Sequence, residues 1–268
     1  MKDFKIGFIG GGNMGGALAV AAIKALGRDR VMIADKDAQA TDAAAMKTGA
    51  TPSTADDIAR ECRLVFLAVK PNVIGAVIDS IKETLNARED EWAAVSMAAG
   101  VTLDSLAEML CEGARVIRMM PNTSVAVGEG MIVYDKRATD EDAEIFEAAM
   151  SKAGVVCPIR EELIDAATAV MGCGPAFAYQ FADALADGGV EAGLSRSDAE
   201  LYAAQMMLGA AKMMLTSDKA PKELRDAVCS PGGSTIEGVR VLEARDLRAA
   251  VMAAVDASYK RTCELGKK

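Results

Sequence analysis

Short apolar runs alternate with helix-like segments through the first 160 residues of this chain, and no comparable run follows Glu161. Several of the runs are continuous and β-branched, which is typical of strands covered on both faces. Such alternation predicts a parallel sheet with right-handed crossovers. Strands are expected at residues 5–10, 30–34, 64–69, 93–98, 116–120, 131–134 and 155–159, and helices at 14–26, 38–47, 73–85, 103–110 and 141–153.

The rest of the chain is rich in alanine, methionine and leucine, and turn signals divide it into helices of roughly 10 to 20 residues. Residues 203–211 are apolar nearly all round, and a helix without a polar face needs burial on every side. A second subunit supplies that burial most simply, although the centre of a monomeric bundle is an alternative. We therefore expect domains at residues 1–160 and 161–268, the second all-helical and mediating homo-oligomerisation.

Composition narrows the possible functions. The chain has no histidine, which excludes imidazole metal sites and Ser-His or Cys-His catalytic pairs. Its 39 acidic residues exceed its 30 basic ones, so nucleic acid is not an expected partner. The six cysteines form no Cys-x-x-Cys motif and are expected to be reduced core residues. No metal is expected.

Two features of the sequence predict a cytoplasmic protein. The first strand-like run begins almost at Met1 and leaves no room for a signal peptide. The longest uncharged run, residues 166–182, is short for a membrane span and contains two glycines and a proline, so no membrane association is expected.

A glycine-rich turn follows the first strand-like run directly and precedes the first helix. Gly10-Gly11-Gly12-Asn13-Met14-Gly15 satisfies the pattern G-x-G-x-x-G in that context. Gly10 would make the tight turn, Gly12 would let the backbone approach a pyrophosphate, and Gly15 would let helix and strand pack closely. The motif predicts a Rossmann-type, doubly wound domain for a dinucleotide, with a nicotinamide cofactor favoured over FAD.

The second strand-like run ends in Asp35-Lys36, where this fold places its ribose-binding residue. Asp35 would accept a hydrogen bond from a free ribose 2′-hydroxyl, whereas Lys36 would pair with a 2′-phosphate. The two residues therefore predict tolerance of both NADH and NADPH. Alternatively, Asp35 is a solvated residue at a strand end.

Two further strand ends carry a proline and a polar side chain, and ligands of open parallel sheets bind beyond such ends. They are Ala68-Val69-Lys70-Pro71 and Met120-Pro121-Asn122-Thr123. Together they predict a wall around the nicotinamide ribose, although either one alone is equally explained by ordinary turn chemistry.

A second glycine-containing loop lies between two helical segments near the end of the chain. Ser230-Pro231-Gly232-Gly233-Ser234-Thr235 would expose consecutive backbone N–H groups at a helix N-terminus, which suits a small carboxylate. A capped turn between two helices is the alternative interpretation of this loop.

Seven segments of the chain, taken in order, resemble pyrroline-5-carboxylate reductase, the last enzyme of proline biosynthesis. The loop from Ser230 to Thr235 is the most specific of them. The segments lie at residues 7–15, 68–71, 98–101, 116–123, 172–177, 183–190 and 230–235. The resemblance implies NAD(P)H-dependent reduction of the cyclic imine 1-pyrroline-5-carboxylate to L-proline. It also implies a Rossmann domain followed by an all-α domain that dimerises through its helices, with higher assembly in many members.

The resemblance also assigns residues to the two ligands. It places Thr235 near the ring nitrogen of the substrate, beside Ser234, with Glu161 on the substrate side. The loop residues Ser230, Gly232 and Gly233 complete the expected substrate site. The expected cofactor site comprises Gly10, Gly11, Gly12, Asn13, Met14, Gly15, Asp35, Lys36, Ala68, Val69, Lys70, Pro71, Ala98 and Asn122.

The chain departs from the usual family pattern at three positions. Cys173 stands where a serine is usual, Ser124 where a proline is usual, and Asp35 where NADPH-preferring members have a neutral residue. The first two departures are expected to alter packing more than chemistry. The third leaves the choice between NADH and NADPH open.

Two other functions are consistent with parts of the sequence. β-Hydroxyacid dehydrogenases share the N-terminal pattern and use a lysine on a helix of the second domain, for which Lys212 is the candidate. A non-catalytic dinucleotide-binding oligomer would keep the fold without turnover. The Ser230–Thr235 loop disfavours both, because neither needs a second anion-binding loop.

Overall fold

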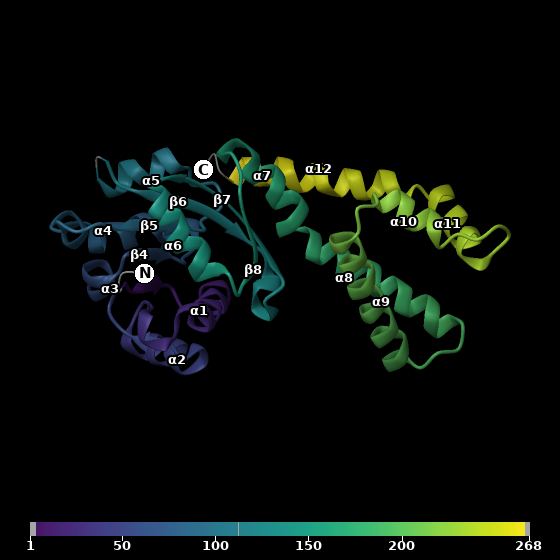
Figure 1. Ribbon diagram of the computed structural model, residues 1–268, viewed down its shortest axis with the longest axis horizontal. Helices are drawn as coiled ribbons and strands as arrows, with labels where there is room; N and C mark the ends of the chain where they lie inside the picture. Colours follow the sequence, from purple (N-terminus) through teal and green to yellow (C-terminus); the bar gives the residue numbers. More distant parts are fainter. Residues whose placement is uncertain (1–3, 112, 266–268) are drawn as a thin grey trace. The chain divides into compact units, whose positions relative to one another are not determined.

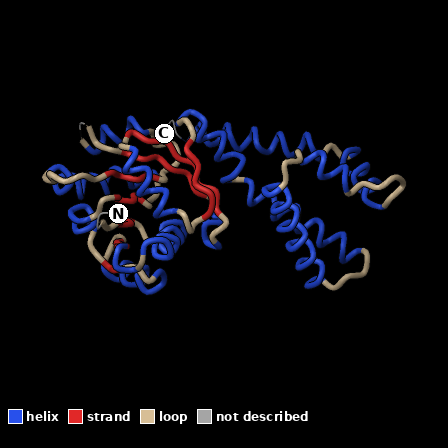
Figure 2. Tube along the Cα trace, viewed as in Figure 1, coloured by secondary structure: helices blue, strands red, loops and turns tan. Residues whose placement is uncertain are grey.

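The computed structural model describes residues 4–111 and 113–265 and contains two compact units. The first unit comprises Met1–Gly172 and Tyr259–Lys268, and the second comprises Cys173–Ser258. The strand signal of the sequence ends near residue 160, but residues 161–172 and the described end of the last helix also belong to the first unit. All eight strands of the described chain belong to this unit, as Figure 2 shows.

The first unit is a doubly wound sheet with the strand order β3-β2-β1-β4-β5-β6-β7-β8. Every neighbouring pair is parallel except β6 and β7. The strands are β1 (Ile6–Ile9), β2 (Val31–Ala34), β3 (Thr51–Pro52), β4 (Leu64–Leu67), β5 (Ala93–Ser96), β6 (Val116–Pro121), β7 (Gly130–Arg137) and β8 (Gly154–Pro158). The seven expected strands are therefore present, together with the short β3.

The β6–β7 pair corrects the expectation of an entirely parallel sheet. Residues 122–129 connect the two strands through the 3₁₀ turn Thr123–Val127. A parallel crossover needs about a dozen residues or more, so this connection is too short to return the chain to the other end of the sheet. The strands pair antiparallel instead, and β7 then pairs with β8 in parallel.

Helices cover both faces of the sheet, as Figure 1 shows. Alternate residues of β1 explain why: Phe8 packs with α1, α2 and α6 on one face, whereas Ile9 packs with α3, α4 and α5 on the other. The Phe8 ring stacks on Phe66 at 4.4 Å between centroids. The helices of the first unit are α1 (Asn13–Leu26), α2 (Ala38–Thr48), α3 (Ala55–Glu61), α4 (Pro71–Asn86), α5 (Leu103–Leu110), α6 (Asp140–Met150) and α7 (Ile164–Ala167).

The second unit is all-helical, as expected, and buries few of its apolar side chains. Its helices are α8 (Gly174–Glu191), α9 (Arg196–Thr216), α10 (Pro221–Ala227), α11 (Ser234–Ala244) and α12 (Leu247–Leu265), the last of which ends in the first unit. Along α9 only Ala199 and Ala203 are buried, whereas Leu201, Leu208 and Leu215 are 63%, 58% and 82% exposed. Within the second unit, the described residues therefore leave the apolar surface of α9 without a covering.

Among the described residues, none of the helices combines the length and the apolar composition that a membrane span needs.

Candidate functional site

The glycine-rich turn connects β1 to α1, and neighbouring backbone atoms leave no room for a Cβ at two of its glycines, Gly10 and Gly15. Gly10 has a φ of +111°, and a Cβ there would lie 2.4 Å from the carbonyl oxygen of Ala68. A Cβ on Gly15 would lie 2.2 Å from the carbonyl oxygen of Gly10. These close contacts bring the turn against the end of β4, where Ala68 and Val69 border it; their expected place beside the cofactor stays a prediction.

Gly12 differs from the other two glycines because no atom lies within 4 Å of the position that its Cβ would occupy. It is the N-cap of α1, and the first turn of that helix contains no acidic residue. The first N–H groups of a helix lack intrahelical partners and carry the positive end of its dipole. The space at the Cβ position of Gly12, together with the first N–H groups of α1, suits a pyrophosphate, so the residues present fit a dinucleotide.

Asp35 follows β2 and is fixed beside the glycine-rich turn. The Gly11 N–H donates to Oδ2 of Asp35 at 2.7 Å, and the Lys36 N–H donates to Oδ1 at 2.7 Å. The Asp35 N–H donates to Oγ1 of Thr41 at 2.8 Å, on α2. The structure thus joins two segments of the expected cofactor site, and the Lys36 side chain is exposed.

The remaining expected cofactor residues lie at the carboxyl ends of neighbouring strands. Lys70 is the N-cap of α4, with Pro71 as its first residue, and both are exposed. Ala98 follows β5, and its N–H donates to Oγ of Ser96 at 3.2 Å. β1, β2, β4 and β5 are parallel neighbours, so their carboxyl ends lie on one edge of the sheet.

Asn122 follows β6 and connects two other segments. Its Oδ1 accepts from the Met131 N–H at 3.1 Å, and its Nδ2 donates to the Met171 carbonyl at 3.0 Å. Met171 lies in a π-helical turn, Thr168–Gly172, a conformation often found at functional sites. The Asn122 side chain thus fixes the backbone around the end of β6.

Glu161 belongs to an ion-pair cluster in the first unit. Its Oε1 accepts from Nη1 of Arg118 at 2.9 Å and from the N–H of Leu103 at 2.8 Å, at the start of α5. Asp165 accepts from Nη2 of Arg118 at 3.1 Å, and Asp135 accepts from the N–H of Glu161 at 2.7 Å. Arg118, which lies in β6, is buried. The expected role of Glu161 beside the substrate stays a prediction, and its oxygen Oε1 already serves this cluster.

Sequence reasoning missed Arg118, Asp135 and Asp165. Arg118 is the only charged residue in the run 116–121, which is otherwise apolar. A charge in a buried strand needs a partner of opposite sign, so the isolated arginine in this apolar run could have predicted a buried ion pair. Nothing in the spacing of the chain indicated which carboxylates would meet it.

The expected substrate loop lies in the second unit between α10 and α11. Gly232 has a φ of +68°, and the Gly233 N–H donates to the Ser230 carbonyl at 3.0 Å to close the turn. Gly233 is the N-cap of α11, and Ser234 and Thr235 are its first residues, both exposed. The loop therefore has the geometry of an anion-binding helix N-terminus with two hydroxyl groups beside it.

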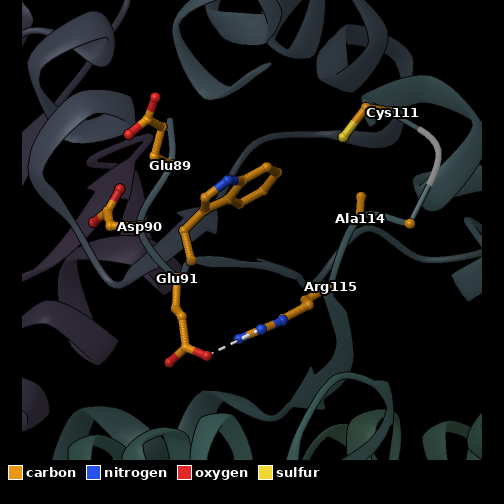
Figure 3. Close-up of a pocket in the computed structure, with 8 residues that line it drawn as sticks. Glu89, Asp90, Glu91, Cys111, Ala114 and Arg115 are labelled. Carbon is orange, nitrogen blue, oxygen red and sulfur yellow. Dashed lines mark hydrogen bonds and ion pairs between the residues drawn. The ribbon is translucent and has the colours of Figure 1, made fainter. Parts of the chain in front are cut away.

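A separate pocket of about 220 Å³ lies at the opposite edge of the sheet (Figure 3). Its lining residues precede β5 and β6, whereas the expected cofactor residues follow the strands. Nη2 of Arg115 donates to Oε1 of Glu91 across it at 3.2 Å. This pocket includes none of the expected site residues, which are Gly10 to Gly15, Asp35 and the others named above.

All six cysteines lie among the described residues and are free. Cys62 is buried as expected, and burial raises the pKa of its thiol to about 12. Four others are only partly buried and Cys157 is exposed, so the expectation of core cysteines is confirmed for Cys62 alone and is wrong for Cys157. Its place on β8, at the edge of the sheet, explains the exposure.

Comparisons with known proteins agree over both units. The family described as "Pyrroline-5-carboxylate reductase dimerisation" matches residues 161–265, and "NADP oxidoreductase coenzyme F420-dependent" matches residues 5–100. Pyrroline-5-carboxylate reductase from Methanosarcina acetivorans is 40% identical over all of both chains. Human pyrroline-5-carboxylate reductase 2 is also 40% identical, over 97% of this chain and 83% of its own length.

Solved structures give the same result. Pyrroline carboxylate reductase from Plasmodium falciparum, with NADP bound, superposes with a TM-score of 0.86 at 31% identity, over 99% of each chain. Pyrroline-5-carboxylate reductase from Coxiella burnetii superposes with a TM-score of 0.89 at 31% identity, over 98% of each chain.

Proposed function

The chain belongs to the pyrroline-5-carboxylate reductase family, and we propose that its residues bind and orient the cyclic imine 1-pyrroline-5-carboxylate for reduction to L-proline. It is an NAD(P)-dependent oxidoreductase that acts on a C=N bond. Bound NAD(P)H supplies the hydride for the imine carbon. The protein's own contribution is to place the imine, exclude water and keep the ring nitrogen protonated.

The observation that supports this proposal best is the loop from Ser230 to Thr235. The positive φ of Gly232 and the N-cap position of Gly233 leave the first N–H groups of α11 available for the substrate carboxylate. The hydroxyl of Thr235 lies in the same helical turn and would hydrogen-bond the ring nitrogen. A cyclic imine is basic enough to bind already protonated, so the lack of histidine is no obstacle.

The cofactor would bind along the carboxyl edge of the first sheet. The pyrophosphate would lie on the backbone from Gly10 to Gly15, and the adenosine ribose beside Asp35 and Lys36. Ala68 to Pro71, Ala98 and Asn122 would border the nicotinamide end. Either reduced nicotinamide dinucleotide is consistent with these residues as a set.

The reaction is tested by following absorbance of NADH and NADPH with 1-pyrroline-5-carboxylate, beside a six-membered imine analogue. Thr235→Ala is expected to lower kcat/KM by about tenfold or more, because the ring nitrogen loses its partner, while cofactor affinity is unchanged. Kinetics equal to those of the parent would remove Thr235 from the site. Oxidation of 3-hydroxy acids, or cofactor binding without imine reduction, would contradict the proposed reaction.

The second unit carries the dimerisation domain of this family. We propose a homodimer through α8 to α12, open to further assembly, because the apolar side chains of α9 have no other covering within the described chain. We also propose a cytoplasmic location, which the six free thiols favour.

A further inference from the structure

The carboxylate of Asp35 is immobilised where the adenosine ribose of a dinucleotide would lie. Both of its oxygens accept backbone N–H groups at 2.7 Å, Oδ2 from Gly11 and Oδ1 from Lys36. Its own N–H is held by Oγ1 of Thr41. Three hydrogen bonds thus fix one residue, and one of them comes from the glycine-rich turn itself.

The position of Gly11 makes this arrangement rigid. A Cβ there would lie 2.3 Å from the Cβ of Ala44 on α2, so the backbone of the turn packs tightly against that helix. If Asp35 moved aside for a bulkier ligand, the N–H groups of Gly11 and Lys36 would both lose their acceptor. The carboxylate is therefore a fixed part of the site.

Charge around Asp35 disfavours a further anion. Asp37, two residues later, is the N-cap of α2, and its Oδ1 accepts from the Ala40 N–H at 2.8 Å. Two carboxylates thus flank Lys36, whose ammonium is the only positive charge in the segment 35–37. A 2′-phosphate would bring a nearly dianionic group against a fixed carboxylate, with one exposed lysine to offset it.

We propose that Asp35 makes this enzyme prefer NADH over NADPH. Each carboxylate oxygen keeps a second lone pair, so Asp35 accepts a hydrogen bond from the ribose 2′-hydroxyl of NADH, and its charge repels the 2′-phosphate of NADPH. This inference rests on the proposed cofactor site.

The test measures binding, so that it does not depend on imine reduction. Titration calorimetry of the full-length protein compares NADH with NADPH, and 5′-AMP with adenosine 2′,5′-bisphosphate, which differ only in the 2′-phosphate. The wild-type protein is expected to bind the unphosphorylated member of each pair at least about tenfold more tightly. The preference is expected to shrink as salt rises, because screening weakens the repulsion.

Asp35→Asn removes the charge and keeps an oxygen for the Gly11 N–H. We expect it to reduce the preference by about tenfold, and Asp35→Ser to do the same. Asp37→Asn is the matched control, since it removes an equal charge two residues away and keeps a good helix cap. It should change the preference by less than about threefold. Melting curves without ligand show whether each variant is folded.

The outcomes separate this inference from the proposed function. Equal or tighter binding of NADPH by the wild-type protein would overturn the role of Asp35 and leave the reductase intact. Equal effects of the Asp35 and Asp37 variants would also overturn it, because net charge would then be the cause. Failure of both dinucleotides to bind would instead contradict the proposed cofactor site.

Discussion

Arg118 is a buried cation whose two terminal nitrogens meet Glu161 and Asp165. Glu161 also accepts the first N–H of α5 through Leu103, so one carboxylate satisfies a guanidinium and a helix end together. Removal of one partner from such a cluster leaves the other groups buried without an acceptor, which costs more than the pair itself contributes. At the residue scale, a single substitution in this cluster should therefore destabilise the protein.

Glu161→Ala is expected to lower the free energy of unfolding by about 2 kcal/mol, because Arg118 keeps only Asp165. Urea denaturation measures the loss. Glu162→Ala is the control, since Glu162 pairs with Arg160 where both side chains are more than half exposed. That variant should change stability by less than about 0.5 kcal/mol. Equal midpoints for the two variants would show that the cluster does not stabilise the fold.

The buried thiol of Cys62 makes the stability of the protein depend on pH. It is fully buried, with Sγ 3.6 Å from Sδ of Met32, and burial raises its pKa from 9.0 to about 12. The unfolded chain therefore loses this proton first, so the contribution to stability is full below pH 9 and is lost as pH rises toward 12.

Denaturation curves from pH 7 to pH 10 are expected to show less loss of stability at high pH in Cys62→Ala than in the parent. Thiol labelling at neutral pH supplies an independent measurement. Cys157 is exposed and should react in the native protein, whereas Cys62 should react only after unfolding. Equal labelling rates at the two positions would contradict the burial of Cys62.

At the scale of elements, two glycines of the turn between β1 and α1 have different roles, Gly12 in cofactor binding and Gly15 in packing. Gly12→Ala places a Cβ in open space at a φ of −64°, so we expect stability within about 0.5 kcal/mol of the parent. Cofactor affinity should fall by about tenfold or more, because the methyl group takes the space for the pyrophosphate. Gly15→Ala should instead destabilise the protein itself, by about 1 to 3 kcal/mol, since its Cβ meets the Gly10 carbonyl.

Melting curves without ligand, followed by calorimetry with NADH, measure the two effects separately. A Gly12→Ala variant that binds the cofactor like the parent would move the pyrophosphate away from this turn. A Gly15→Ala variant as stable as the parent would show that α1 shifts to admit the methyl group.

Elements with strong periodicity were predictable from the sequence, and short ones were not. Long apolar runs located seven strands and the helices between them. β3 (Thr51–Pro52) and α3 (Ala55–Glu61) were missed because neither is long enough to show a period. The antiparallel pairing of β7 follows from the length of a connection, which patterning of single segments does not reveal.

The candidate site likewise contains residues that the sequence predicted and residues that it did not. Backbone-defined positions such as Gly10 and Gly232 were found because their conformations demand glycine, which the sequence displays directly. Long-range side-chain partners were not found. The hydrogen bond from Gly11 to Asp35 spans 24 residues, and the Arg118–Glu161 pair spans 43, so only the folded chain brings them together.

At the scale of the whole molecule, the homodimer proposed above would cover the exposed apolar surface of α9. Leu201, Leu208 and Leu215 recur every seven residues and so form one stripe along the helix. Burial of an exposed leucine contributes about 1.5 to 3 kcal/mol, so three per subunit support a stable dimer. The melting temperature of such a protein should rise with its concentration.

Leu208→Lys is expected to weaken the dimer, because a buried ammonium would have no partner in an apolar interface. Light scattering coupled to gel filtration should show a parent of at least two chains and a variant shifted toward one chain, with a lower melting temperature. Met46→Lys is the control, since Met46 is 84% exposed on α2 in the first unit and its replacement should leave the mass unchanged.

A parent that remains a single chain at micromolar concentration would mean that the stripe is covered within the monomer. In that case Leu208→Lys would lower the melting temperature by the same amount at every protein concentration, whereas loss of a dimer produces a shift that grows as concentration rises, because only the parent gains stability from association.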